Sequence, residues 1–254
     1  MRGQYIEGIL QSCRRTGKYV DMKADGVISL PDLAIFPSCA FAQGLNGEKR
    51  ELEMMENIGS FHAAFPTIEV LVVDNGVSRP RIPDFAKLSY FPELRTDHPS
   101  LGEVNLLRKA IADIGDDVRV LKLHARCRVS NLASLNRQLL TSGDFLLLNR
   151  NLFSWFNRGA DVLPYIDTRV FCLESYLLRE LLSSAACFIE KTHGRFEHAM
   201  LKGLLENPDI YGFVKARGCF YPVMRGQSGH IRDYDNYLSL LRSNIKSLLF
   251  RIGV

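Results

Sequence analysis

The sequence EVLVVDNG at residues 69–76 contains the clearest strand pattern in the chain. Its apolar run is continuous, which is typical of a strand that is covered on both faces of a sheet. A second apolar run lies upstream at residues 33–36, and a charged segment with helical periodicity, residues 48–65, connects the two runs until Pro66 ends it. Strand, helix and strand in this order predict a mostly parallel, doubly wound α/β sheet.

The same alternation continues along the chain. Ser100 is the expected N-cap of a helix over 101–114, with Glu103 as its capping-box partner. We expect further strands at 87–90, 118–123, 145–148 and 170–173, and helices at 174–187, 195–206 and 235–251. Residues 1–30 are expected to form a helical N-terminal extension. Residues 31–254 are expected to form one domain, mostly helical from about residue 174, because no linker or repeat divides them.

Composition and charge exclude several classes of protein. The chain has 254 residues and a net charge of +4, too weak to indicate nucleic-acid binding, so we expect no nucleic-acid partner. The charge suits an anionic small ligand or an anionic membrane surface. No stretch approaches the ~18 apolar residues of a spanning helix, and no secretory signal is visible, so we expect a cytoplasmic location. The six cysteines form no CxxC pair and are expected to be reduced and buried.

The common catalytic motifs are missing. No GxGxxG opens a helix after a strand, and no GxxxxGK[ST] loop is present, which argues against a classical dinucleotide site and a P-loop. Neither HExxH nor GxSxG occurs. His193 and His198 are five residues apart, which does not fit a metal-binding pair on one helix face.

Polar side chains instead follow the predicted strands. Parallel strands place their carboxyl ends at one edge of the sheet, where ligands bind in such folds. Two or three cations and two carboxylates at that edge would suit a diphosphate with a sugar or ribose attached. There are two alternatives to a ligand site: residues 74–76 would only form a turn, and the cations at the strand ends would only be solvated. The candidate residues are Asp74, Asn75, Lys122, His124, Arg126, Asp167 and Arg169.

These residues, from about Leu33 to the C-terminus, resemble the bacterial glycosyltransferases of surface-polysaccharide and lipopolysaccharide clusters. That family's pattern has a Gly-Glu helix start, a Lys-x-x-Gly-Arg-Tyr strand end and an Asp-Thr/Ser-Arg segment. The sequence departs from it at Ala125, where glycine is expected, and at Cys127, where an aromatic residue is expected. The matching positions are Gly102, Glu103, Lys122, Arg126, Asp167 and Arg169.

The resemblance implies a GT-A-like fold that uses a nucleotide-sugar donor, with Asp74, Asn75, Lys122, Arg126 and Arg169 as donor-binding residues. The leaving diphosphate gains negative charge and needs a fixed counter-charge. Two solutions stay open: Asp167 helps to bind Mg²⁺ or Mn²⁺, or Arg169 supplies the positive charge itself.

Catalysis by inversion also needs a carboxylate base that takes the acceptor's hydroxyl proton. Glu103, Glu190 and Glu197 are the candidates, and Glu103, Glu197 and Asp167 form the catalytic set that we expect. Each of the three also has a purely structural explanation. Glu103 would be a capping-box residue, Glu190 a charge on a helix surface, and Glu197 one member of an i,i+4 pair.

Two other functions stay open. One is a sugar nucleotidyltransferase, although residues 38–41 do not supply its Gly-rich phosphate loop. The other is a non-catalytic relative that binds a glycan or a partner enzyme. The acceptor is expected to be a glycan or glycolipid, and the basic helix at 235–251 could bring the chain to the inner face of the membrane as a peripheral protein.

Overall fold

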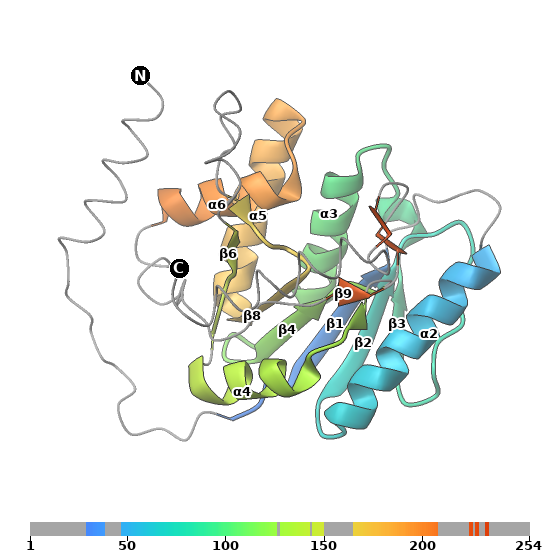
Figure 1. The fold of residues 1–254 in the computed structure, drawn as a ribbon. Helices are drawn as coiled ribbons and strands as arrows, with labels where there is room; N and C mark the ends of the chain where they lie inside the picture. Colours follow the sequence, from blue (N-terminus) through green and yellow to red (C-terminus); the bar gives the residue numbers. More distant parts are fainter. Residues whose placement is uncertain are drawn as a thin grey trace.

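The computed structural model in Figure 1 describes residues 29–38, 47–125, 128–142, 144–149 and 165–207, together with three short strands between 224 and 233. Its centre is a five-stranded sheet in the order β3-β2-β1-β4-β8. The first four of these strands run parallel, and β8 runs antiparallel to β4. The predicted, mostly parallel α/β sheet is therefore confirmed. The strands are β1 (Leu33–Ser38), β2 (Glu69–Asp74), β3 (Lys87–Tyr90), β4 (Arg119–Leu123) and β8 (Val170–Glu174).

Helices cover both faces of this sheet, as Figure 1 shows. Successive strand residues point to opposite faces. Ala34 and Phe36 of β1 pack with the side chains of α2 and α4, whereas Leu33 and Ile35 pack with those of α3, α5 and α6. Two apolar layers result, one on each side of the sheet. The helices are α2 (Gly47–Ala64), α3 (Pro99–Ile111), α4 (Leu132–Ser142), α5 (Ser175–Thr192) and α6 (Phe196–Glu206).

Small antiparallel pairs lie outside the main sheet. Strand β5 (Arg128–Val129) pairs with β9 (Met224–Arg225), β6 (Leu148–Asn149) pairs with β7 (Tyr165–Ile166), and β10 (Gln227–Ser228) pairs with β11 (Arg232–Asp233). A 3-10 turn, η1 (Pro92–Leu94), precedes α3. None of the helices in the described part of the chain is both long and apolar enough to cross a membrane.

The predicted strand at 145–148 is wrong as a single element. Phe145 makes one isolated antiparallel bridge to Cys172 of β8. The chain then leaves β8: the Leu147 carbonyl accepts from the Asp167 N–H at 2.7 Å, and Leu148 pairs with Ile166 in β6 and β7. One apolar run thus serves two partners, which its hydrophobicity does not reveal.

The predicted cap of α3 is also wrong. The helix begins at Pro99, and His98 is its N-cap, with the imidazole accepting from the Leu101 N–H at 3.3 Å. Proline suits the first helical position because the N–H that it lacks would have no intrahelical partner there. Ser100 consequently lies inside the helix, and Glu103 pairs elsewhere.

The expectation for the cysteines holds for one of the two that the structure describes. Cys172 is a free, buried thiol, and burial is the largest cause that raises its pKa to about 12. Cys187 is also free, but it is exposed, because it falls on the face of α5 opposite the one buried through Ala185, Ala186 and Ile189.

Some predictions concern residues outside the described ranges. These are the helical extension within residues 1–28, the basic helix at 235–251, and the side chains of Arg126 and Cys127.

Candidate functional site

The candidate site lies at the carboxyl ends of β1 and β4. Strands β2 and β3 follow on one side of β1, whereas β4 lies on the other, so the sheet changes direction of growth between β1 and β4. Ligands bind at such switch points in open α/β sheets. Because β8 is antiparallel, its first residue, Val170, pairs with Leu123 at the end of β4. The segment that precedes β8 therefore arrives at the same edge.

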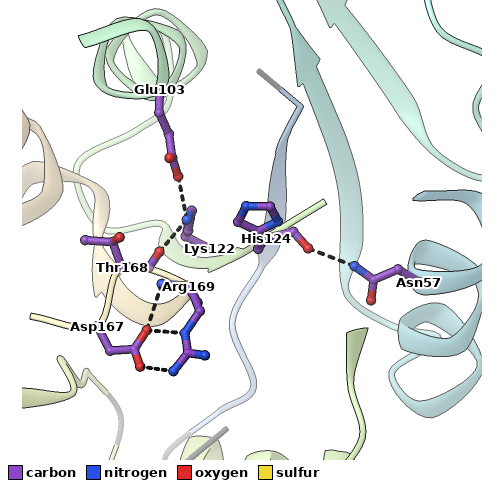
Figure 2. Close-up of polar contacts among 7 residues, drawn as sticks. All are labelled: Asn57, Glu103, Lys122, His124, Asp167, Thr168 and Arg169. Atoms are coloured by element: carbon purple, nitrogen blue, oxygen red, sulfur yellow. Dashed lines mark hydrogen bonds and ion pairs between the residues drawn. The ribbon is translucent and has the colours of Figure 1, made fainter. Parts of the chain in front are cut away.

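Lys122 is the buried centre of this edge. It points to the α3 face of the sheet, and 1% of its side chain is exposed. Its Nζ lies 2.6 Å from Glu103 Oε1 of α3, an ion pair without the alignment of a good hydrogen bond, and it donates to the Thr168 carbonyl. The ammonium also lies 5.9 Å from the ring centre of Phe171. Lys122 thus connects helix α3 to the turn before β8, as Figure 2 shows.

Asp167 and Arg169 form a two-pronged ion pair within one turn (Figure 2). Arg169 Nε donates to Asp167 Oδ1 at 2.8 Å, and Nη2 donates to Oδ2. The backbone N–H of Arg169 also donates to Oδ1, at 3.2 Å. Burial alone would raise the pKa of Asp167, but the Arg169 charge and hydrogen bonds, with a smaller contribution from Lys122, lower it below its usual value. Asp167 is thus held as a carboxylate.

The backbone of this turn is anchored at each residue. The Asp167 N–H donates to Leu147, the Thr168 carbonyl accepts from Lys122, and the Arg169 carbonyl accepts from the His124 N–H at 3.0 Å. The predicted grouping of Lys122 with Asp167 and Arg169 is therefore present in the geometry, while the roles of these residues stay predictions.

Asn57 of α2 also contacts this edge of the sheet, although it is not among the residues predicted from the sequence. Its side-chain amide is buried and donates to the carbonyls of His124 at 2.8 Å and Ala125 at 3.0 Å. It fixes the end of β4 from the opposite face of the sheet, as Figure 2 shows for His124. A polar residue amid the apolar face of a helix, between Met54 and Ile58, was the signal that could have found it.

Asp74 and Asn75 lie at the end of β2 and are both buried. Asp74 Oδ1 accepts from the Gly76 N–H at 2.6 Å, and the Asn75 amide donates to the Leu94 carbonyl at 3.3 Å. These contacts are the turn chemistry that the sequence also allowed. They hold the chain between β2 and η1, and donor binding by this pair stays a prediction.

The three candidate bases have different surroundings. Glu103 is paired with Lys122. Glu190, near the end of α5, lines an open hollow of about 460 Å³ together with His98 and His193. Glu197 lies in the first turn of α6 and is half-buried. Of these carboxylates, Glu103 is the one whose ion pair, with Lys122, argues against service as a base.

The arrangement also tests whether Asp167 fits a divalent cation. Mg²⁺ needs carboxylate oxygens that are open to the ion and to its remaining ligands. Both oxygens of Asp167 instead accept from Arg169, and 3% of the carboxylate side chain is exposed. As arranged here, Asp167 does not fit a metal, and its partner holds the position that the ion would need.

Comparisons with known proteins give structural likeness alone. No family model matches the sequence, and no curated protein matches it. A structure of the galactosyltransferase LgtC with donor and acceptor sugar analogues aligns at 14% identity and a TM-score of 0.48, covering 87% of this chain and 95% of that one. An active-site mutant of LgtC aligns at 17% identity and 0.45, covering 68% and 69%.

The enzyme 4-diphosphocytidyl-2C-methyl-D-erythritol synthase aligns at 14% identity and a TM-score of 0.40, covering 70% of this chain and 99% of that one. At these TM-scores and identities the likeness carries no functional argument.

Proposed function

We propose that the chain is a GT-A-like glycosyltransferase that moves a sugar from a nucleotide-sugar donor to a glycan or glycolipid in surface-polysaccharide synthesis. The observation that supports this most is the Arg169 side chain, which Asp167 holds in the turn before β8, at the carboxyl end of β4, where Lys122 and His124 anchor the backbone of the turn. A fixed cation at this position suits the diphosphate that leaves when the sugar is transferred.

The residues divide into two roles under this proposal. Arg169 would contact the diphosphate, since a guanidinium matches phosphate oxygens with two parallel N–H donors. Lys122 would act as a positioning residue, because it is buried and reaches the Thr168 carbonyl rather than solvent. Of the expected catalytic set, Glu103 is paired with Lys122 and Asp167 with Arg169, so we propose Glu197, the remaining member, as the base. A lipid-linked acceptor would bring the chain to the cytoplasmic face of the membrane.

The Glu103–Lys122 ion pair favours a second candidate as well, a non-catalytic relative that binds a glycan or a partner enzyme. This role needs the donor or glycan site but no base. A transfer assay separates the two: an enzyme releases nucleoside diphosphate from its donor, and Glu197→Gln abolishes that release without changing donor affinity. A chain that binds donor and never releases the diphosphate is the non-catalytic relative.

Thermal-shift screening with UDP-, GDP- and CMP-sugars tests the proposal as a whole. A ligand at 100 times its dissociation constant adds ~2.7 kcal/mol to the free energy of unfolding. We expect a UDP- or GDP-sugar to raise the melting temperature and Arg169→Ala to remove the rise, whereas the CMP-sugar, which has no diphosphate, serves as the comparison. If none of them stabilises the folded chain, the proposed function is wrong.

A further inference from the structure

We propose that Arg169 takes the place of a divalent metal ion in this site, so that the chain binds the diphosphate of its donor without a metal. This inference rests on the proposed function and deepens it, because it chooses between the two sources of positive charge that the sequence leaves open. It also departs from the expectation that Asp167 is a metal ligand.

Arg169 engages both oxygens of the Asp167 carboxylate. Asp167 Oδ1 accepts from Nε at 2.8 Å and from the backbone N–H at 3.2 Å of the same residue, Arg169, and Oδ2 accepts from Nη2. Because Arg169 is two residues away in the same turn, the pair forms locally. A metal ion would have to displace a partner that the chain itself supplies two residues away.

The ion pair turns Arg169, rather than Asp167, toward solvent. The Asp167 side chain is 3% exposed and the Arg169 side chain 20% exposed. The carboxylate is therefore the inner member of the pair, and the guanidinium is the outer one. A ligand that approaches from solvent meets the cation first, which suits a phosphate, whereas a metal-binding carboxylate would have to face the ligand itself.

Hydrogen bonds from the end of β4 hold the backbone of the turn at 167–169 in place. Lys122 and the His124 N–H hold the carbonyls of Thr168 and Arg169, so the turn cannot rotate Asp167 outward without losing these contacts. A guanidinium carries five N–H donors, enough to bridge a carboxylate and a phosphate. Its charge acts in a partly dry site, where a counter-charge is worth more than in water.

Calorimetric titration with UDP, GDP and CDP, each in EDTA and in Mn²⁺, tests the inference. We expect the nucleotide that binds to have the same affinity in both buffers within about twofold. We expect Arg169→Ala and Arg169→Lys each to weaken binding at least tenfold, since lysine cannot form the two-pronged contact. Arg108→Ala, an exposed arginine of α3, is the matched control and should bind as the wild type does. Circular dichroism verifies that each variant is folded.

Two other outcomes are separable. Binding that is at least tenfold tighter in Mn²⁺ overturns the metal-free site and leaves the proposed function intact. If no nucleotide binds in either buffer, the proposed function fails. Titration with inorganic pyrophosphate in EDTA then tests the inference by itself. Pyrophosphate binding that Arg169→Ala abolishes supports the metal-free anion site, and lack of pyrophosphate binding overturns it. Mn²⁺ is also titrated into the protein alone and its binding is followed by electron paramagnetic resonance. We expect the wild type and Asp167→Asn to bind Mn²⁺ equally, because Asp167 is not a metal ligand.

Discussion

Lys122 occupies a buried position of a kind that an apolar side chain normally fills. It lies between Leu121 and Leu123 in β4 and is as buried as they are. A buried ammonium requires a partner, because desolvation of the charge is expensive. Glu103 supplies the charge and the Thr168 carbonyl accepts a hydrogen bond. The residue therefore stabilises the fold and positions the candidate site at the same time.

Lys122→Met should cost about 3–5 kcal/mol of unfolding free energy, since it leaves the Glu103 carboxylate without its cation. Glu103 is 21% exposed, which favours the lower end of this range. Urea denaturation measures the loss. The matched control is Lys87→Met, which breaks an ion pair with Glu69 of similar length, 2.7 Å, between exposed side chains; it should cost at most about 1 kcal/mol. Equal effects of the two substitutions would contradict the role of Lys122.

Asp167 predicts a pH dependence of stability with a definite sign. Its pKa in the folded chain is below the usual 3.8 because Arg169 outweighs the effect of burial. Its ionised form therefore stabilises the fold above that usual value, and the contribution is lost as the pH falls through the lowered pKa. Asp167→Asn should cost about 1.5–3 kcal/mol at pH 7, and this difference from the wild type should shrink below pH ~4.

Asp144 gives the control of opposite sign. Burial, and then the nearby Glu174 carboxylate, raise its pKa above 3.8, and they outweigh the opposing effect of Arg119, whose Nε lies 3.5 Å from Asp144 Oδ1. Its ionised form therefore lowers stability, and Asp144→Asn should gain stability at pH 7, with the gain vanishing as the pH falls through the raised value. Urea unfolding at several pH values between 7 and 3 measures both variants. A constant difference across this range for Asp167→Asn would contradict the ion pair.

Among the elements, helix α3 begins with a different N-cap residue, His98, from the one that the sequence predicts, Ser100. His98 caps the helix through Nδ1, and its Nε2 lies 3.2 Å from the His193 carbonyl at the end of α5. Since Nδ1 accepts the Leu101 N–H, Nε2 must be the protonated nitrogen of the neutral ring. The imidazole thus joins the beginning of α3 to the end of α5, a contact between residues 95 positions apart.

His98→Ala should lower the free energy of unfolding by about 0.5–2 kcal/mol, the usual cost of a lost N-cap. His98→Asn should recover part of the loss, because its side-chain oxygen can accept the same N–H. Ser100→Ala, at the position that the sequence predicts as the cap, should change stability by less than about 0.5 kcal/mol. Thermal or urea unfolding of the three variants measures this, and a larger loss for Ser100→Ala than for His98→Ala would restore the sequence-based cap.

Most elements could be predicted from local patterns. The continuous apolar runs at 33–36, 69–73 and 170–173 are strands, and the 3.6-residue periodicity before Pro66 is a helix, since these patterns reflect burial that the element itself creates. Two predictions were wrong because they depended on contacts with residues far away in the sequence. The run at 145–148 divides its hydrogen bonds between β8 and β7, and the cap of α3 depends on Pro99 and on the distant His193.

In the molecule as a whole, the antiparallel direction of β8 brings the turn at 167–169 to the carboxyl end of β4. If β8 ran parallel to β4, the turn before it would lie at the opposite edge of the sheet, away from Lys122. The sequence could place Lys122 and Asp167 next to strands, but it could not give the direction of β8. The pairing of Leu123 with Val170 supplies that information. The same long-range arrangement explains why Asn57 escaped notice, because its partners lie 67 and 68 residues away.

Under the proposed function, the turn at 167–169 binds the diphosphate of a nucleotide-sugar donor. The most direct test is calorimetric titration of the donor that stabilises the chain into the wild type, Arg169→Ala and the exposed control Arg108→Ala. We expect Arg169→Ala to lose about 1.5–3 kcal/mol of binding free energy, or about 10- to 150-fold in affinity, while Arg108→Ala binds as the wild type does. Unchanged donor affinity in a folded Arg169→Ala variant would contradict the claim.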